Sequence, residues 1–105
     1  MTICYRGEMK TPGGKLVAVE FKIDSNRLRN VTITGDFFLY PEESLPMLTA
    51  TIEGMPLDSG EEQIRSRISS FLERHHDDIT LVGTSPDAIA AAVSRALASE
   101  QTARS

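Results

Sequence analysis

The alternation of apolar and polar residues in the first forty positions constrains the fold more than any other feature. One stretch places its apolar side chains on every second position: Val17, Val19, Phe21 and Ile23. Side chains two residues apart share one face of a strand, so this stretch is typical of a half-buried strand. Weaker alternation precedes it at residues 3–10, and a third alternating stretch covers residues 31–38. Turn-forming residues at 11–14 and 24–26 separate the three stretches, which predicts a three-stranded antiparallel meander.

The period changes after Pro41, where apolar residues begin to recur at helical spacing. The first helical pattern is short and ends at a glycine: Leu45, Leu48, Ile52 and Gly54. Ser44 as the N-cap places Pro46 in the first turn, where a missing N–H costs nothing. We therefore expect residues 41–44 to form a separate turn ahead of this helix.

Two longer helices follow. The second carries one apolar stripe: Ile64, Ile68, Phe71 and Leu72. The third opens at Ser85 and Pro86, a capping residue followed by proline at the first helical position. Its buried face is rich in alanine, which indicates close packing: Ile89, Ala92, Val93, Ala96 and Leu97.

These elements predict one α+β domain, in which three helices cover one face of a three-stranded antiparallel sheet. We expect the domain to span residues 1–99 and residues 100–105 to form a frayed polar tail. The length of 105 residues fits a single domain that buries a core without a disulfide or metal.

Charge and cysteine content exclude several classes of function. The net charge of −4 disfavours non-specific binding to nucleic acid or to an anionic membrane surface. A single cysteine, Cys4, excludes a disulfide framework and a multi-cysteine metal site. No apolar run approaches the ~20 residues of a membrane span, and no secretory signal is visible. We expect a cytoplasmic protein.

The loop between the first two predicted strands contains Gly13, Gly14 and Lys15. Consecutive glycines let a backbone approach a partner closely, and Lys15 would present a charge to a phosphate or a carboxylate. A plain hairpin turn with a solvated lysine explains the same residues. Both interpretations stay open, with the plain turn favoured on physical grounds alone.

The third strand ends in Asp36, Phe37 and Phe38, with Tyr40 close behind. Phe37 and Phe38 face opposite sides of a strand, so both cannot enter one core. An exposed aromatic here would indicate an interface. Alternatively, Phe38 packs under the first helix and Asp36 caps a turn.

Two further groups contain residue types that can carry chemistry. The run from His75 to Asp78 lacks the spacing of a metal site, because adjacent helical residues do not face one ion. Cys4 lies in a predicted strand without a neighbouring base, so we do not expect it to act as a nucleophile.

Two motifs together resemble a known family. The run from Pro12 to Val17, followed by the run from Ile33 to Phe38, resembles the accessory domain of lipoate–protein ligase. In some enzymes this domain ends a longer chain, and in split enzymes it is a separate small subunit. The resemblance continues through Pro41–Glu42 and the Ser85–Ile89 segment, and it spans most of residues 7–98.

The resemblance implies a non-catalytic accessory subunit of a lipoate–protein ligase. A separate large subunit would bind ATP, Mg²⁺ and lipoate and form lipoyl-adenylate, and this chain alone would bind no cofactor. The large subunit would then transfer the lipoyl group to a lysine in acceptor domains of 2-oxoacid dehydrogenase or glycine cleavage complexes. The accessory domain would close over the active site and exclude water from the adenylate.

The same resemblance implies the site residues. Six positions would lie at the subunit interface or support it: Gly13, Gly14, Lys15, Asp36, Phe37 and Phe38. The implied fold is also similar to that of iron–sulfur scaffold and sulfur-acceptor proteins. A sulfur-acceptor or cluster-assembly module is therefore one alternative, although one cysteine cannot hold a cluster. A free-standing small-molecule binding domain is another.

Overall fold

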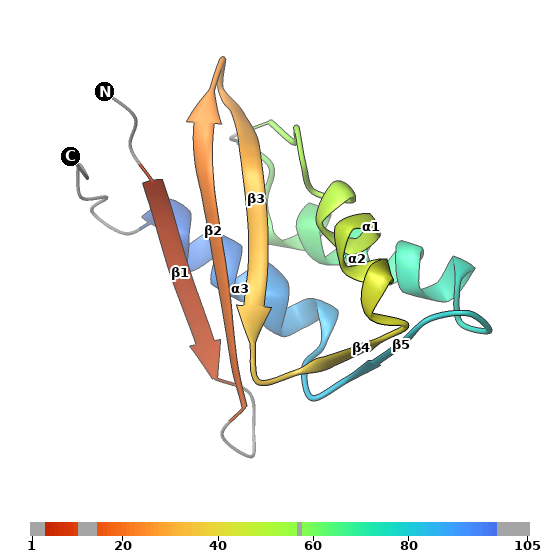
Figure 1. Ribbon diagram of the computed structural model, residues 1–105. Helices are drawn as coiled ribbons and strands as arrows, with labels where there is room; N and C mark the ends of the chain where they lie inside the picture. Colours follow the sequence, from red (N-terminus) through yellow and green to blue (C-terminus); the bar gives the residue numbers. More distant parts are fainter. Residues whose placement is uncertain (1–3, 11–14, 57, 99–105) are drawn as a thin grey trace.

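The computed structural model describes residues 4–10, 15–56 and 58–98. Its main sheet is antiparallel in the order β1-β2-β3, as the alternating pattern predicts (Figure 1). The strands are β1 (Cys4–Lys10), β2 (Leu16–Asp24) and β3 (Arg27–Gly35). The predicted turn at 24–26 joins β2 to β3, and Ser25 and Asn26 both have positive φ. The predicted tail at 100–105 and the glycines at 13 and 14 lie outside the described residues.

The helical half also follows the prediction, with differences at the two ends of the first helix. The sequence predicts that this helix stops at Gly54, whereas it ends at Ala50 and residues 51–54 form turns. The helical elements are η1 (Glu42–Ser44), a single 3-10 turn, then α1 (Leu45–Ala50), α2 (Glu61–Arg74) and α3 (Pro86–Ala98). Ser44 occupies the N-cap position of α1 and Pro46 its first turn. The Ser44 hydroxyl makes no capping bond to the described residues, because η1 runs directly into α1 and already holds Ser44 in helical conformation. At α3, Ser85 Oγ does accept from the Ala88 N–H at 3.2 Å.

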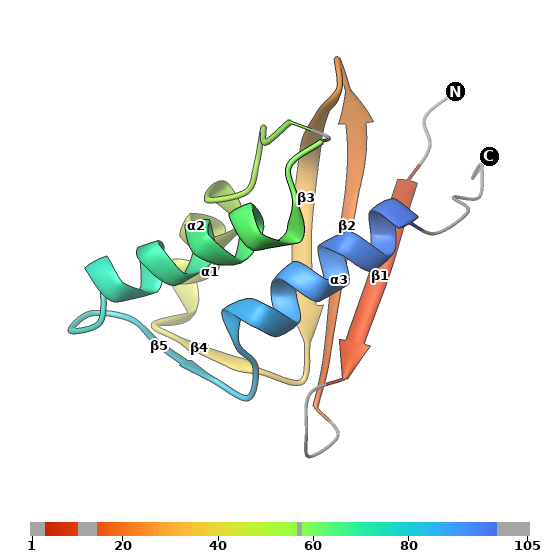
Figure 2. The ribbon, with the colours of Figure 1, turned by 180° about the vertical axis from the view of Figure 1, so that it is seen from behind.

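Helix α3 lies directly across β1 and β2, and α2 lies beside α3 on the same side, whereas α1 lies beside β3 (Figure 1 and Figure 2). The approach is close because Gly7 on β1 faces two alanines of α3. A Cβ added to Gly7 would lie 2.0 Å from the Ala92 carbonyl oxygen and 2.5 Å from the Ala96 nitrogen. The small residues of the third helical pattern thus set the distance between helix and sheet.

A second sheet was not predicted from the sequence. Strand β4 (Phe38–Tyr40) pairs antiparallel with β5 (Thr80–Val82), and we call this pair the β4–β5 ribbon. It extends sideways from the end of β3 (Figure 1). Leu39 is buried in the core, whereas Phe38, Tyr40 and Val82 are exposed. Three-residue strands are too short to show a period of two, which explains why the pattern did not reveal them.

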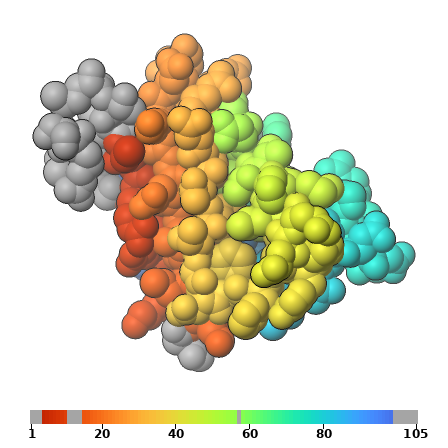
Figure 3. All heavy atoms as spheres, viewed as in Figure 1, coloured from red at the N-terminus to blue at the C-terminus, as the bar shows by residue number. Residues whose placement is uncertain are grey.

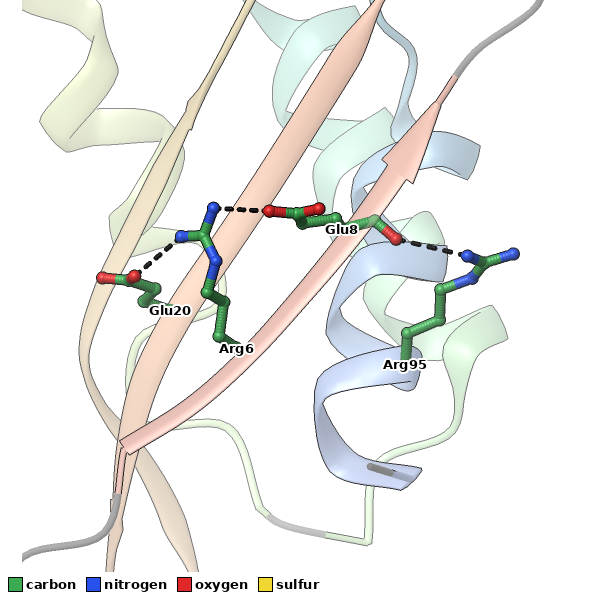
Figure 4. Close-up of polar contacts among 4 residues, drawn as sticks. All are labelled: Arg6, Glu8, Glu20 and Arg95. Atoms are coloured by element: carbon green, nitrogen blue, oxygen red, sulfur yellow. Dashed lines mark hydrogen bonds and ion pairs between the residues drawn. The ribbon is translucent and has the colours of Figure 1, made fainter. Parts of the chain in front are cut away.

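The outer face of the main sheet is polar. Arg6 donates to Glu20 at 2.7 Å and to Glu8 at 2.6 Å, and Arg95 of α3 donates to the Glu8 carbonyl (Figure 4). The hydrogen bond to Glu8, followed by the one to Glu20, raises the pKa of Arg6. The side chains are about half exposed, so such pairs contribute at most about 1 kcal/mol each. The face is solvated, as its composition predicts. No helix in the described part of the chain has the length and apolar character needed to cross a membrane.

Candidate functional site

Three connections meet at one end of the molecule: the start of β2, the β3–β4 corner and the β5–α3 connection (bottom of Figure 1). The Asp36 N–H donates to the Leu16 carbonyl at 2.8 Å, which fixes the corner against β2. Gly35 permits this contact, because a Cβ there would lie 2.1 Å from the Leu16 oxygen. Gly83 adopts a φ of 97° beside Phe37 and brings the third connection to the same place.

The first hollow at this end contains Lys15, and we call it the Lys15 hollow. Its volume is about 610 Å³. The lining residues come from β1, the residue before β2, the start of α2, the β5–α3 connection and α3: Met9, Lys15, Glu61, Gly83, Thr84, Ser85, Asp87, Ala88 and Ala91. Thr84 Oγ1 is buried there without a hydrogen-bond partner among the described residues. The hollow thus combines apolar surface with one basic and two acidic side chains.

The acidic side of the Lys15 hollow is tied to α2. Arg65 pairs with Asp87 at 3.5 Å and also forms an ion pair with Glu62. The hydrogen bond from Arg65 holds the pKa of the Glu62 carboxyl below its ordinary value. These exposed charges link the start of α3 to the start of α2.

A second hollow lies between the end of β3 and β4, and we call it the aromatic hollow. Its volume is about 390 Å³. Three of its lining side chains carry a polar group, namely Thr34, Tyr40 and Glu42. The full lining is Ile33, Thr34, Gly35, Phe37, Phe38, Leu39, Tyr40, Glu42 and Leu45. Phe38 and Tyr40 stack with ring centroids 6.1 Å apart, and both are more than half exposed. Figure 3 shows the atoms of β4 and η1, in yellow, at the surface beside β3.

The six predicted site residues are distributed as follows. Gly13 and Gly14 lie outside the described residues, and Lys15 lines the first hollow. Phe37 and Phe38 line the second hollow, while Asp36 is exposed at the corner beside them. The alternative in which Phe38 packs under the first helix is wrong, because its side chain is 56% exposed.

Sequence reasoning missed part of this end. The segment from Gly83 to Ala88 lines the Lys15 hollow, and Val82 extends the exposed apolar surface of the ribbon. Ser85 and Pro86 were identified only as a helix start, although Gly83 ahead of them is a turn signal. Nothing local in the sequence indicates that this turn meets the β3–β4 corner.

The other candidates lie elsewhere. Cys4 is exposed on β1, where it pairs with Lys22 of β2. His75 packs against the Phe71 ring, and His76 contacts the Glu73 carbonyl and Asp77. Across residues 4–10, 15–56 and 58–98, no three side chains of metal-ligating type come together.

The fold and the site define a small α+β domain with two hollows and exposed aromatic side chains at one end. The comparisons with known proteins are specific. The chain is 32% identical over 65 residues to lipoate-protein ligase A subunit 2 from Thermoplasma acidophilum, a match covering 62% of this chain and 68% of that protein. No family model matches the sequence.

The structural comparison agrees. The fold matches one chain of an archaeal lipoylation system from the same organism, described as a bi-partite lipoate protein ligase and its E2 lipoyl domain. The TM-score is 0.66 at 27% sequence identity, over 89% of this chain and 97% of that chain. The chain belongs to the family of small subunits of split lipoate–protein ligases.

Proposed function

We propose that this chain is the non-catalytic accessory subunit that a separate large subunit needs for ATP-dependent activation of lipoate. The activated product is lipoyl-adenylate, and the large subunit then transfers its lipoyl group to a lysine of an acceptor domain. A mixed anhydride of this kind hydrolyses in water, so a subunit that closes the active site has a direct chemical purpose.

The observation that carries the proposal is the extent of the structural match. It covers 97% of a chain from a bi-partite ligase, so the likeness extends over a whole chain and not over one shared motif. The arrangement of this chain supports the same role. The β3–β4 and β5–α3 connections lie at one end (Figure 1), with the exposed aromatic residues Phe38 and Tyr40, where a second protein can reach them.

The proposed contact residues are the six that the resemblance implies. Gly13, Gly14 and Lys15 would meet the large subunit near its ligand pocket, where Lys15 contacts a phosphate or a partner carboxylate. Asp36, Phe37 and Phe38 would support or form the same interface. The meeting of β2 with the β3–β4 corner supports this grouping, because the Asp36–Leu16 hydrogen bond joins the two segments.

ATP, Mg²⁺ and lipoate are assigned in this proposal to the large subunit. The acceptors would be lipoyl domains of 2-oxoacid dehydrogenase or glycine cleavage complexes. For this chain the proposal requires surface complementarity to the large subunit and exclusion of water from the closed site.

The test is pyrophosphate release by the purified large subunit with ATP and lipoate, measured with and without this chain. We expect this chain to raise the rate strongly and to form a complex on a sizing column. Lys15→Ala should weaken the increase, whereas Lys22→Ala, on the main sheet outside both hollows, should not. An unchanged rate and no complex would overturn the proposal. An increase that Lys15→Ala leaves intact would remove only the role of Lys15.

One observation favours a second candidate, a free-standing small-molecule binding domain. The Lys15 hollow of about 610 Å³ is within the size range of ligand pockets. This candidate predicts that lipoate or ATP binds the isolated chain. Calorimetry on the chain alone decides between the two, since the accessory-subunit proposal requires no such binding. The sulfur-acceptor alternative gains no support from Cys4, which lies within a strand and not on a loop.

A further inference from the structure

The β4–β5 ribbon exposes apolar side chains together on one face. Phe38 pairs directly with Val82 across the ribbon, and directly paired residues share a face. Tyr40 lies two residues from Phe38 on the same strand and stacks on it. The exposed fractions are 56% for Phe38, 52% for Tyr40 and 48% for Val82. Scattered exposed apolar residues are ordinary, but a stacked and paired group beside a hollow indicates a contact surface.

The segments that build this surface contain no lysine or arginine, and their two histidines, His75 and His76, lie before β5. No lysine or arginine stands between Arg29 and Arg65, or between Arg74 and Arg95. The same segments bring exposed carboxylates to the ribbon: Asp36 before β4, Glu42 and Glu43 after it, and Asp77 and Asp78 before β5. Glu42 lines the aromatic hollow itself. Within these segments the residues of fixed charge are therefore acidic, while Lys15, which lines the neighbouring hollow, adds a positive charge at the same end.

We propose that the β4–β5 ribbon face, comprising Phe38, Tyr40 and Val82 with the adjoining aromatic hollow, is the surface that docks on the large ligase subunit. The matching surface of the large subunit is an apolar depression bordered by lysine or arginine. The inference rests on the proposed function, because it requires a large subunit as partner. It adds to that function Tyr40, Val82 and Glu42, and a defined electrostatic character for the interface.

The charges also argue against a second copy of this chain as the occupant. A symmetric dimer through the ribbon would place the same carboxylates of both copies against each other. Like charges brought together across an interface are unfavourable, whereas a basic border on a different protein is attractive. In protein interfaces, a few residues dominate binding where large aromatic side chains lie at the centre of the interface and charged residues surround them.

The first experiment measures the dissociation constant between the full chain and the purified large subunit by calorimetry. Phe38→Ser and Val82→Ser should each raise it at least about tenfold. Met47→Ser is the matched control, since Met47 is an apolar side chain on α1, 45% exposed and outside the ribbon. It should change the constant less than about threefold. Circular dichroism of each variant verifies the fold. Ribbon variants that bind like wild type, or a Met47 effect of equal size, would overturn the inference.

The second experiment tests the charge. Glu42→Lys should weaken binding and reduce its dependence on salt, because it removes one attractive charge and adds a repulsive one. Binding that is unchanged or tightened by Glu42→Lys would contradict a basic partner surface.

Two controls test whether a molecule other than the large subunit binds the ribbon face. Wild-type chain alone should elute as a monomer, and a dimer that Phe38→Ser dissociates would instead assign the ribbon to self-association. A purified lipoyl acceptor domain should not bind the chain through Phe38 without the large subunit; if it does, the inference is wrong. The failure of wild type to bind the large subunit would overturn the proposed function as well. Wild-type binding with unaffected ribbon variants would overturn this inference alone.

Discussion

At the scale of single residues, glycines decide where elements can touch. Gly7 lets α3 rest on β1, and Gly35 lets the β3–β4 corner contact β2. A Cβ at Gly7 would lie 2.0 Å from a backbone oxygen and a Cβ at Gly35 would lie 2.1 Å from one, far inside van der Waals contact. Neither contact can relax by rotating a side chain, because the opposing atoms belong to the backbone. The packing of α3 on the main sheet therefore depends on the absence of a side chain at Gly7. The position of the β3–β4 corner depends in the same way on Gly35.

Gly7→Val should destabilise the protein by about 3 kcal/mol or more, at the upper end for overpacking a closely packed interior. The reason is the 2.0 Å approach to the Ala92 oxygen. Urea denaturation followed by circular dichroism measures the loss. Gly60→Ala is the control, since a Cβ there meets nothing within 4 Å. Its cost should stay below about 1 kcal/mol, as expected at a helix N-cap. Equal losses for both variants would show that Gly7 is not a packing constraint.

Glu53 is a second residue whose role emerges only in three dimensions. Its carboxylate accepts from the Asn30 and Val31 N–H groups, each at 2.9 Å. Asn30 has a φ of 55°, so the strand locally turns its N–H groups toward the segment after α1. Glu53 thus joins that segment to β3.

Glu53→Ala should cost about 1–3 kcal/mol, because two backbone donors lose a charged acceptor. Glu53→Gln keeps one acceptor oxygen and should cost less. Thermal denaturation of the three proteins gives the order wild type, Gln, Ala from most to least stable. Glu43→Ala, at an exposed position on η1, serves as the control and should have little effect. If Gln and Ala proved equally costly, the hydrogen bonds to β3 would not explain the effect.

At the scale of elements, the sequence predicts what is local and periodic. The alternation in β2 and the Ser85–Pro86 start of α3 each determine an element without help from distant residues. The β4–β5 ribbon could not be predicted, because its strands have three residues each and are separated by η1, α1 and α2. The candidate site could likewise be predicted only in part. The aromatic run at Phe37 and Phe38 is visible in the sequence, whereas the meeting of Val82 with Phe38 depends on the whole fold.

The ribbon should also be the less stable of the two sheets. It has three residue pairs, whereas β2 lies between two long partners in the main sheet. Amide hydrogen exchange of the free protein should therefore be faster in β4 and β5 than in β2. Mass spectrometry of peptic peptides measures the difference. Equal protection of β4 and β2 would mean that the ribbon unfolds only with the whole domain.

At the scale of the whole molecule, the two ends of the sheet differ. One end holds the β4–β5 ribbon and both described hollows. The other end holds the β2–β3 turn (Figure 1). A smaller hollow of about 280 Å³ lies there, lined by Ser25, Asn26, Arg27, Pro56 and Asp58. This end carries both basic and acidic residues, Arg27 and Asp58, and no exposed large aromatic side chain among the residues described. The two ends of the molecule therefore differ in the side chains that they expose.

That difference predicts where protection appears when the large subunit is added. Amides of residues 35–45 and 80–84 should exchange more slowly in the complex, because docking buries the ribbon and suppresses its local opening. Amides of residues 24–27 should exchange at the same rate in both states, and they are the internal control. The measurement uses wild-type chain at a large-subunit concentration well above the dissociation constant, so that the bound fraction is nearly complete. Slower exchange at residues 24–27 with no change in the ribbon would place the partner at the opposite end of the sheet. Slower exchange at both ends would indicate general stiffening on binding, and the ribbon variants would then have to locate the contact.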